Sequence, residues 1–430
     1  MLFQRNKTAG APLWTRDFTI LTVGSAISLF GNAMSGFATG LLVLDYTGSS
    51  FLFAVFLAVY TLPQILAPMV SGAILDRFSR RKTIYSLDFI SAGLYGISAF
   101  LLSRGWFSFP FLAFLAFAVG CITSIYKVAY QSFYPLLIPR GNFSKAYSVS
   151  GVLEALSAIM IPISTFLYKQ LGSMAPILAA NSVFFLAAAI VETRIRAEET
   201  YIVTQQKLLG EQAALEAKPA GSVKVFWRDF KEGIAYLRRE KGLMAITVYF
   251  IFNAIAYASS GVVVLPYFKR AYPPNGEYWY MIVVGMAVVG TVLGGLIQYR
   301  VKIPARWKFG ACVFVYVFTA FMEGFYPWAP IPLAMGMCLL SGLFGSVSTN
   351  IRVASTQSYV PDEKKGRFNG AYNTLFTTGS LVGQLLTGVL VLRWDDRWVL
   401  TGFMMLAALA GVLAVGCNPK AVKPIVNRDQ

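Results

Sequence analysis

The sequence contains no histidine. This absence excludes a histidine-based metal site and catalysis by a Ser/His pair. It also removes the side chain that most readily changes charge near neutral pH, so any coupling to protons must use carboxylates. The chain also lacks the Gly-x-x-x-x-Gly-Lys-Ser/Thr loop that cradles nucleotide phosphates, which argues against direct use of ATP.

Cysteine is scarce and irregularly spaced. The chain has four cysteines in 430 residues: Cys121, Cys312, Cys338 and Cys417. Their spacing matches neither a disulfide framework nor a thiolate metal site, so we interpret them as packing residues. From the absence of histidine and of paired cysteines we expect no metal and no cofactor.

Charged residues make up only 13% of the chain, against 56% hydrophobic residues. A soluble domain carries about 25% charged residues. The apolar residues gather in runs of about 20, the helix length that crosses a hydrocarbon core about 30 Å thick. The first six runs lie near 18–44, 51–75, 83–102, 107–130, 145–168 and 174–191. Six more lie near 242–267, 279–299, 307–326, 331–355, 367–392 and 399–415. The sequence therefore predicts an all-α membrane protein with 12 transmembrane helices.

The net charge of +17 is distributed unevenly across these spans. If both termini lie on one side, 31 of the 37 Lys and Arg residues fall on that side. This is the positive-inside pattern, and it places both termini in the cytoplasm of a multi-pass cell-membrane protein. The lipid bilayer therefore accounts for the basic character, and we expect no nucleic-acid partner.

The two sets of spans repeat one another. The motif Gly-x-Phe-x-x-Ala-Tyr at 141–147 returns at 366–372, an offset of 225 residues, and Lys127-Val-Ala returns at the same offset as Arg352-Val-Ala. Such repeats place a substrate pathway between the two copies, near the middle of the membrane.

We therefore predict three parts along the chain. Residues 1–192 form one six-helix bundle, 193–241 a helical cytoplasmic linker, and 242–430 a second six-helix bundle with a short tail. Asn32-Ala in the first span of the first bundle returns as Asn253-Ala in the second. Both asparagines are candidates for the wall of the pathway, although a hydrogen bond between helices is an equal alternative.

The connection between the second and third spans carries a motif. It reads Gly72-Ala-Ile-Leu-Asp76-Arg77-Phe-Ser-Arg80-Arg81-Lys82. A carboxylate such as Asp76 can accept charge-assisted hydrogen bonds from the N-terminus of a neighbouring helix. The arginines have a second interpretation, because positive charge at this place also fixes topology.

This motif, in a six-plus-six protein, resembles the signature loop of the major facilitator superfamily. Ser79 departs from the family pattern, which often has glycine there, and the second bundle has no equivalent acid. The resemblance implies two pseudo-symmetric bundles and a lock between Asp76 and the start of the eleventh span, near Gly366-Arg367. The lock would close the cytoplasmic side.

Four more stretches resemble the branch of that superfamily that contains macrolide and siderophore exporters. They are Leu44-Asp-Tyr-Thr-Gly-Ser-Ser50, Gln131-Ser-Phe-Tyr-Pro-Leu-Leu-Ile-Pro139, Phe230-Lys-Glu-Gly-Ile-Ala-Tyr-Leu237 and Gly366-Arg-Phe-Asn-Gly370. The resemblance implies a bacterial chain, export of a small molecule, and a monomer.

Among the ionisable residues inside predicted spans, where charge is costly unless it serves a function or meets a partner, we single out four: Asp88, Lys127, Glu154 and Arg352. Lys127 and Glu154 flank the turn at Arg140 at similar distances, so we predict an ion pair. That pair is either structural or a proton site on Glu154. Asp88 lies near the motif arginines, and we favour pairing with them over proton carriage.

Arg352 repeats Lys127, but the position equivalent to Glu154 is Gly379, so Arg352 has no matching acid. It either contacts an anionic part of a substrate, shares Glu154, or extends to the cytoplasmic surface. We expect a secondary transporter that exports a small amphipathic compound by alternating access, with protons as the coupling ion. The alternatives are uptake or exchange of an anionic metabolite or lysolipid, and a membrane enzyme or receptor.

Overall fold

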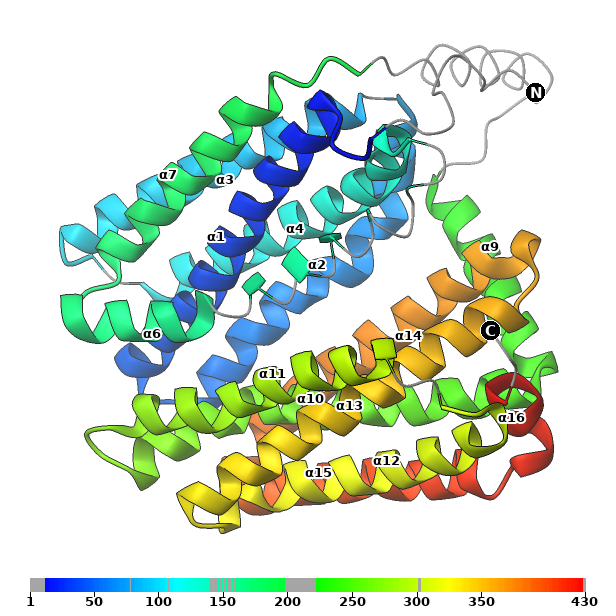
Figure 1. The fold of residues 1–430 in the computed structure, drawn as a ribbon. Coiled ribbons are helices and arrows are strands. Elements are labelled where there is room, and N and C mark those ends of the chain that lie inside the picture. The colour runs from blue at the N-terminus through cyan, green and yellow to red at the C-terminus, as the bar shows by residue number, and fades with distance from the viewer. Residues whose placement is uncertain are drawn as a thin grey trace. The chain divides into compact units, whose positions relative to one another are not determined.

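The computed structural model describes residues 12–77, 79–106, 108–139, 160–197, 222–300 and 303–427, with single or paired residues between 142 and 157. In this part of the chain every regular element is a helix (Figure 1). The helices of the N-terminal half are α1 (Arg16–Thr47), α2 (Ser50–Arg77), α3 (Arg80–Ser103), α4 (Phe109–Leu137), α6 (Met160–Leu171), α7 (Ala175–Glu192) and α9 (Ser222–Arg239). Those that follow are α10 (Lys241–Ala271), α11 (Gly276–Arg300), α12 (Ala305–Phe325), α13 (Ile331–Tyr359), α14 (Asp362–Leu390), α15 (Asp396–Ala410) and α16 (Pro419–Val426). A 3-10 turn, Tyr326–Trp328, follows α12, and a π-helical turn, Gly411–Gly416, follows α15.

The predicted spans coincide with described helices, except for the fifth, which is described as a helix only from Met160. Among the described residues, nine helices are long and apolar enough to cross a membrane. The all-α fold follows from the runs of apolar residues, because a helix satisfies its own backbone hydrogen bonds where no water is present.

The helices form two compact units. Unit 1 comprises residues 1–43 and 62–225, and unit 2 comprises 44–61 and 226–430. In unit 1, α3 and α7 lie side by side (Figure 1). Ser182 donates a hydrogen bond to the carbonyl of Ala92 at 2.6 Å, and it lies directly against Gly96. Small residues at this contact let the two backbones approach closely.

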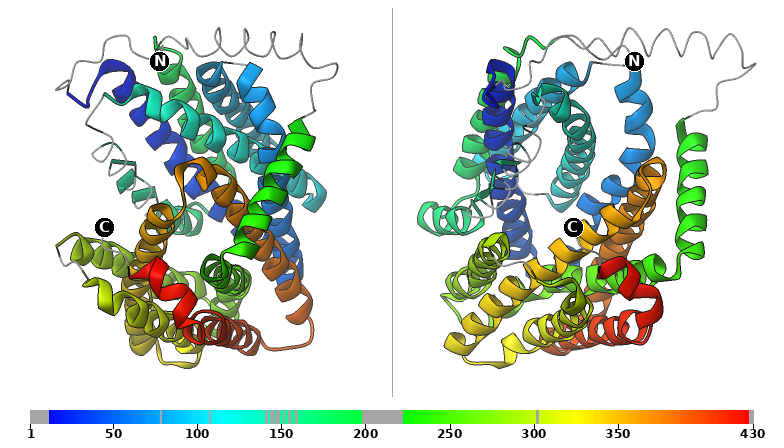
Figure 2. Two further views of the ribbon diagram at one scale, coloured as in Figure 1. Left: turned by 90° about the vertical axis from the view of Figure 1, so that its right-hand side faces the viewer. Right: turned by 45° about the vertical axis from the view of Figure 1, so that its right-hand side comes forward.

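Glycines have the same role in unit 2. A Cβ on Gly290 would lie 2.0 Å from the carbonyl oxygen of Leu339, and one on Gly342 would lie 1.9 Å from that of Ala287. Helices α11 and α13 are therefore in backbone contact at these positions. Helix α16 packs against α10, α12 and α13, and Figure 2 shows it as the short red helix at the C-terminal end.

One segment from the N-terminal half of the sequence belongs to unit 2. Residues 44–61 include the end of α1 and the start of α2. Ala54 lies in an apolar cluster with Ala256 of α10, and a Cβ on Gly388 of α14 would lie 2.7 Å from it. Contacts therefore assign this hairpin to unit 2, whereas the predicted bundle limits follow the order of the sequence.

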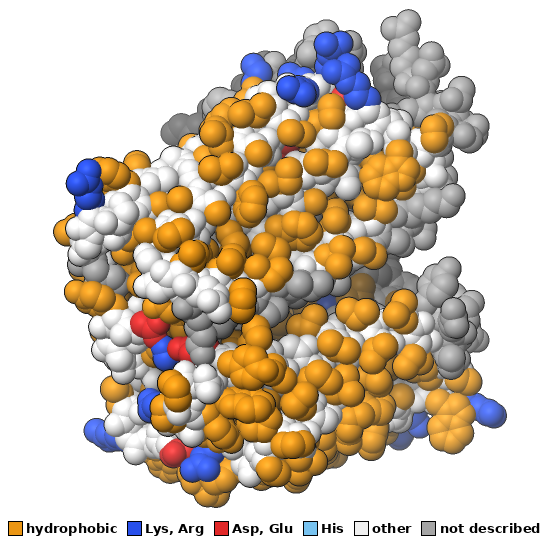
Figure 3. All heavy atoms as spheres, turned by 60° about the vertical axis from the view of Figure 1, so that its left-hand side comes forward, with side chains coloured by type: hydrophobic (Ala, Val, Ile, Leu, Met, Phe, Trp, Pro, Cys, Tyr) orange, Lys and Arg blue, Asp and Glu red, His pale blue; other side chains and the backbone are white. Residues whose placement is uncertain are grey.

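The visible surface of each unit is largely apolar. Figure 3 shows hydrophobic side chains over much of the described surface, with Lys and Arg side chains at its margins. Large exposed side chains include Phe114 of unit 1 and Trp398 of unit 2, each 59% exposed. A lipid environment explains this exposure, since hydrocarbon carries no penalty for contact with apolar side chains.

Candidate functional site

The signature motif forms the end of one helix and the start of the next. Helix α2 continues to Arg77 and α3 begins at Arg80, so the connection is shorter than the sequence suggested. Ser79 is the N-cap of α3, and its side-chain oxygen accepts a hydrogen bond from the backbone N–H of Lys82 at 3.1 Å. Serine is among the preferred N-cap residues, which explains why it replaces the glycine of the family pattern.

Arg81 has a described role within unit 1. Its guanidinium donates to the carbonyl of Ile195 at 2.7 Å, just beyond the end of α7. Positive charge is favourable at a helix C-terminus, so this bond ties α3 to α7. Arg80 lies in the same first turn of α3.

The cytoplasmic lock stays a prediction. The side chains of Gly72, Asp76 and Arg77 lie outside the described part of the structure. Helix α14 begins at Asp362, about one turn before the expected start near Gly366-Arg367. The guanidinium of Arg367 lies 2.8 Å from the carboxylate of Glu232 on α9, so the linker helix packs on α14.

Among the described residues, the partners of Asp88 are not the motif arginines that the sequence suggested, and the Arg77 side chain lies outside the described part. Asp88 is 1% exposed and accepts a hydrogen bond from the hydroxyl of Ser28 on α1 at 2.6 Å. One turn before Ser28, Gly24 lies against the side chain of Glu192, the last residue of α7. Helix α1 therefore brings the carboxyl groups of Asp88 and Glu192 together.

Glu192 is fully buried, and sequence analysis missed it because it lies one residue beyond the predicted sixth span. The hydroxyl of Tyr126 on α4 donates to its Oε1 at 3.4 Å. A Cβ on Gly24 of α1 would lie 2.5 Å from its Cγ, so α1 packs directly on this carboxyl group. The only sequence signal was a lone acid at the end of an apolar run.

The predicted Lys127–Glu154 pair is not tested. Lys127 is exposed on α4, next to Tyr126, and Glu154 lies outside the described residues. Asn32 is partly exposed on α1. Its unit 2 counterpart, Asn253, donates a 3.4 Å hydrogen bond to the hydroxyl of Tyr249, one turn earlier on the same helix. This bond lies within α10, so neither of the proposed roles for the asparagines is decided.

Arg352 of α13 lies against two aromatic rings of unit 2, Phe250 of α10 and Tyr372 of α14, whose centres are 6.3 Å apart. Its guanidinium carbon is 5.0 Å from the ring centre of Phe250 and 4.7 Å from that of Tyr372. The planar, weakly hydrated guanidinium suits contact with aromatic faces. Its Nε is buried without a hydrogen-bond acceptor, and no carboxylate pairs with it among the described residues. The two rings therefore hold the guanidinium within the predicted span, and it can still donate hydrogen bonds to an anionic or carbonyl group.

Unit 2 also buries an acid that the sequence analysis missed. Glu323 on α12 is 9% exposed, and the hydroxyl of Ser341 on α13 donates to its Oε1 at 2.6 Å. Glu323 lies inside a predicted span, so its position alone was a usable signal. Both Glu192 and Glu323 accept from a hydroxyl, but no second carboxyl group lies beside Glu323 among the described residues.

An ion-pair network lies at one end of unit 2. The distribution of Lys and Arg along the sequence predicts that this end faces the outside of the cell. Lys269 of α10 pairs with Asp45 of α1 and lies 3.0 Å from the carboxylate of Glu277 on α11. Its neighbour Arg270 pairs with Asp396 of α15. Asp45 belongs to the hairpin 44–61, so this network holds that hairpin on unit 2.

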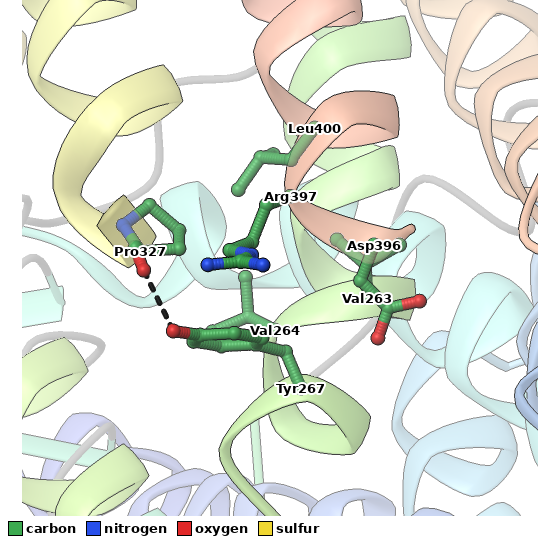
Figure 4. Close-up of a pocket in the computed structure, with 7 residues that line it drawn as sticks. All are labelled: Val263, Val264, Tyr267, Pro327, Asp396, Arg397 and Leu400. Carbon is green, nitrogen blue, oxygen red and sulfur yellow. Dashed lines mark hydrogen bonds between the residues drawn. The ribbon is translucent and has the colours of Figure 1, made fainter. Parts of the chain in front are cut away.

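A small pocket lies beside this network (Figure 4). In Figure 4, Tyr267 donates to the carbonyl of Pro327 at 2.6 Å, and Arg397 lies over the Tyr267 ring. Arg397 also lies 4.3 Å from the Trp328 ring centre. The pocket has no room for a water molecule, so the side chains around it are closely packed.

A roomier cavity of about 310 Å³ lies between α14 and α15. Its lining is apolar and consists of Leu390, Trp394, Trp398, Val399, Gly402, Phe403 and Leu406. Apart from the indole N–H groups of Trp394 and Trp398 its lining side chains are apolar, so it favours hydrocarbon over a particular polar ligand. Across the described chain no cluster of His, Cys, Asp and Glu is arranged to hold a metal ion.

Comparison with known proteins gives a consistent result. The family model described as Major Facilitator Superfamily matches residues 21–383. Macrolide efflux protein A of Streptococcus pyogenes is 22% identical, over 92% of this chain and 95% of that protein. The MFS-type transporter YkuC of Bacillus subtilis is 26% identical, over 75% of each chain.

Solved transporter structures share the fold. The nucleoside transporter NupG matches with a TM-score of 0.64 at 11% identity, over 94% of this chain and 99% of that one. A D-xylose-proton symporter matches with a TM-score of 0.66 at 12% identity, over 93% of this chain and 97% of that one. At such identities the likeness concerns the arrangement of helices alone.

Proposed function

Since the chain belongs to the Major Facilitator Superfamily and is a multi-pass membrane transporter of that family, we propose that it exports a small amphipathic compound by alternating access. The substrate class that we favour is a drug-like molecule or a siderophore. Its relatives include a macrolide efflux protein, similar over 92% of this chain, and this supports export.

The observation that carries the proposal is the setting of Arg352. Its guanidinium lies against the rings of Phe250 and Tyr372, and its Nε has no acceptor among the described residues. Aromatic rings offer contact area to the apolar part of an amphipathic compound, and the guanidinium offers donors to its carbonyl, hydroxamate or carboxylate oxygens. One site thus provides both kinds of contact.

The same residue favours a second candidate, the uptake or exchange of an anionic metabolite or lysolipid. An arginine without a carboxylate among the described residues is suited to a carboxylate or phosphate, which it binds with two parallel hydrogen bonds. The two candidates differ in how far binding depends on charge, because an exporter of neutral compounds would retain affinity without Arg352.

Residues that the sequence singled out complete the proposed cycle. Asn32 and Asn253 belong to the pathway, and Lys127 with Glu154 is the pair at which a proton is exchanged. Asp76 closes the cytoplasmic side against α14, while Gly72 and the motif arginines shape that connection. The two bundles, 1–192 and 242–430, move about the linker 193–241, and the working form is a monomer with both termini in the cytoplasm of a bacterial cell.

Thermal stability of purified protein with candidate ligands tests the proposal. The panel contains a macrolide, a lipophilic cation, a citrate-type siderophore and a lysophospholipid, each with wild type and with Arg352→Ala. Arg393→Ala is the matched control, because Arg393 is an exposed arginine outside the site. Stabilisation by the macrolide or siderophore supports export of that class, whereas stabilisation by the lysophospholipid alone, lost in Arg352→Ala, supports the second candidate.

Flux measurements in proteoliposomes then decide direction and chemistry. Outward movement of the stabilising ligand, recovered unmodified, is expected. Recovery of a chemically altered product would show that the protein is a membrane enzyme and not a transporter. Binding without flux in either direction would point to a receptor on the same scaffold.

A further inference from the structure

We propose that Asp88 and Glu192 form a proton-binding site enclosed within unit 1, where the two carboxyl groups share one proton. This site lies on α3 and α7 and is separate from the Lys127–Glu154 pair and from Arg352. Proton binding there does not depend on export, whereas its use as a coupling site rests on the proposed function.

The first argument is the proximity of two acids. Ser28, which donates to Asp88, lies one turn after Gly24, which lies against the Glu192 side chain, so α1 contacts both carboxyl groups. An ionised carboxylate has acceptors only, so two neighbouring carboxylates cannot bond unless one of them carries a proton. A proton on either supplies the missing donor.

The second argument is burial without a counterion. Asp88 is 1% exposed and Glu192 is 0% exposed. The groups that face them are the hydroxyls of Ser28 from α1 and Tyr126 from α4, with Tyr130 beyond Tyr126 on α4. Two negative charges without a cation are strongly unfavourable at such a site, because like charges in contact repel and burial removes their hydration.

The third argument is an unpartnered oxygen. Glu192 Oε2 is buried and has no hydrogen-bond donor in the described part of the chain. Its other oxygen, Oε1, accepts from Tyr126. A buried acceptor without a donor costs free energy, and a proton held between the carboxyl groups is the smallest ligand that meets the need. The contact of α1 at Gly24 leaves no space beside Glu192 Cγ for a larger ligand.

Packing around the pair ties proton exchange to helix movement. Helix α1 presents Gly24, Ser28, Gly31 and Ser35 on one face at helical spacing. Gly31 lies against Asn181 of α7, and Ser35 donates to the hydroxyl of Tyr95 on α3 at 2.9 Å. A proton from water enters only when α1 separates from α3 and α7. It binds one carboxylate oxygen as an O–H bond, and it returns to water on release. No other reactant is involved.

Infrared spectroscopy of the full-length protein in lipid tests this directly, with pH as the only variable. The variants are Asp88→Asn and Glu192→Gln, which preserve shape. Glu323→Gln is the matched control, because Glu323 is a buried acid with a hydroxyl partner. Gel filtration and melting temperature establish that each variant is folded.

We expect a carboxylic-acid C=O band near pH 7 that disappears in alkali. This band should be missing from Asp88→Asn and from Glu192→Gln. The control Glu323→Gln removes only the signal of Glu323, so the band of the acid pair should titrate in it as in wild type. A band unchanged in both pair variants, or a midpoint set by sodium concentration, overturns the proposal. If one pair variant does not fold, the other still decides, and Tyr126→Phe should move the midpoint without removing the band. Absence of flux with the band intact would count against the proposed transport, not against this site.

Discussion

The two units differ in the ionisable groups that they hold. Unit 1 encloses two acids, Asp88 and Glu192, and no described cation faces them. Unit 2 encloses the acid Glu323, which has a hydroxyl partner, and holds a cation, Arg352, against two rings, where no described acid pairs with it. The repeat preserves sequence motifs such as Gly-x-Phe-x-x-Ala-Tyr, but the ionisable residues inside the predicted spans differ between the two copies. Repetition of the sequence therefore does not fix where charge is placed.

Gly24→Ala is expected to have the largest effect on stability. A Cβ there would lie 2.5 Å from Glu192 Cγ and would push α1 off the acid pair. Overpacking of this kind costs about 2 kcal/mol, which a lowered melting temperature would report. Gly36→Ala on the same helix has nothing within 4 Å and should be neutral. Equal melting temperatures of both variants would contradict the described packing.

Arg352→Ala should reduce transport of a stabilising ligand about tenfold, which corresponds to about 1.4 kcal/mol of lost interaction. Arg352→Lys should be nearly as impaired, because an ammonium group lacks the plane that lies against Phe250 and Tyr372. The initial rate of flux in proteoliposomes measures both. If Arg352→Ala transported at the wild-type rate, as the control Arg393→Ala should, Arg352 would have only a structural role.

The pair of Lys269 and Asp45 should show a coupling free energy of about 1 kcal/mol in a double-mutant cycle. Their side chains are 23% and 24% exposed, so solvent screens the interaction in part. The cycle compares melting of Lys269→Ala, Asp45→Ala and the double variant. Strict additivity would show that this ion pair does not hold the hairpin 44–61 on unit 2.

Asp395→Asn should have the smallest effect, below about 1 kcal/mol, since the Asp395 side chain is 50% exposed. Partial burial favours the neutral acid, but the backbone N–H and guanidinium of Arg397 outweigh it and lower the pKa of Asp395. The stabilisation is therefore present above the ordinary aspartate pKa of about 3.9 and is lost as pH falls through the lower folded value. Melting temperatures of variant and wild type, measured from pH 6 downward, should converge only when the pH falls below that lowered pKa. If the difference in melting temperature between wild type and variant grew as the pH fell, the pKa of Asp395 would be raised and not lowered.

The sequence by itself determined the helices and their membrane character. Runs of about 20 apolar residues cannot satisfy their backbone in lipid except as helices, so the spans follow from local composition. The same local signal singled out Asp88 and Arg352, because a charge in an apolar run is conspicuous wherever the helix packs.

Only the tertiary structure decided which partner each charge meets. The Asp88 and Glu192 positions are separated by 104 residues and meet because α3 packs along α7, information that no local pattern contains. Likewise, the rings around Arg352 come from α10 and α14, and Asp45 joins unit 2 by contacts with α10. Hydropathy fixes how a segment crosses the membrane, but helix packing, set by shape and by small residues such as Gly24, fixes its neighbours.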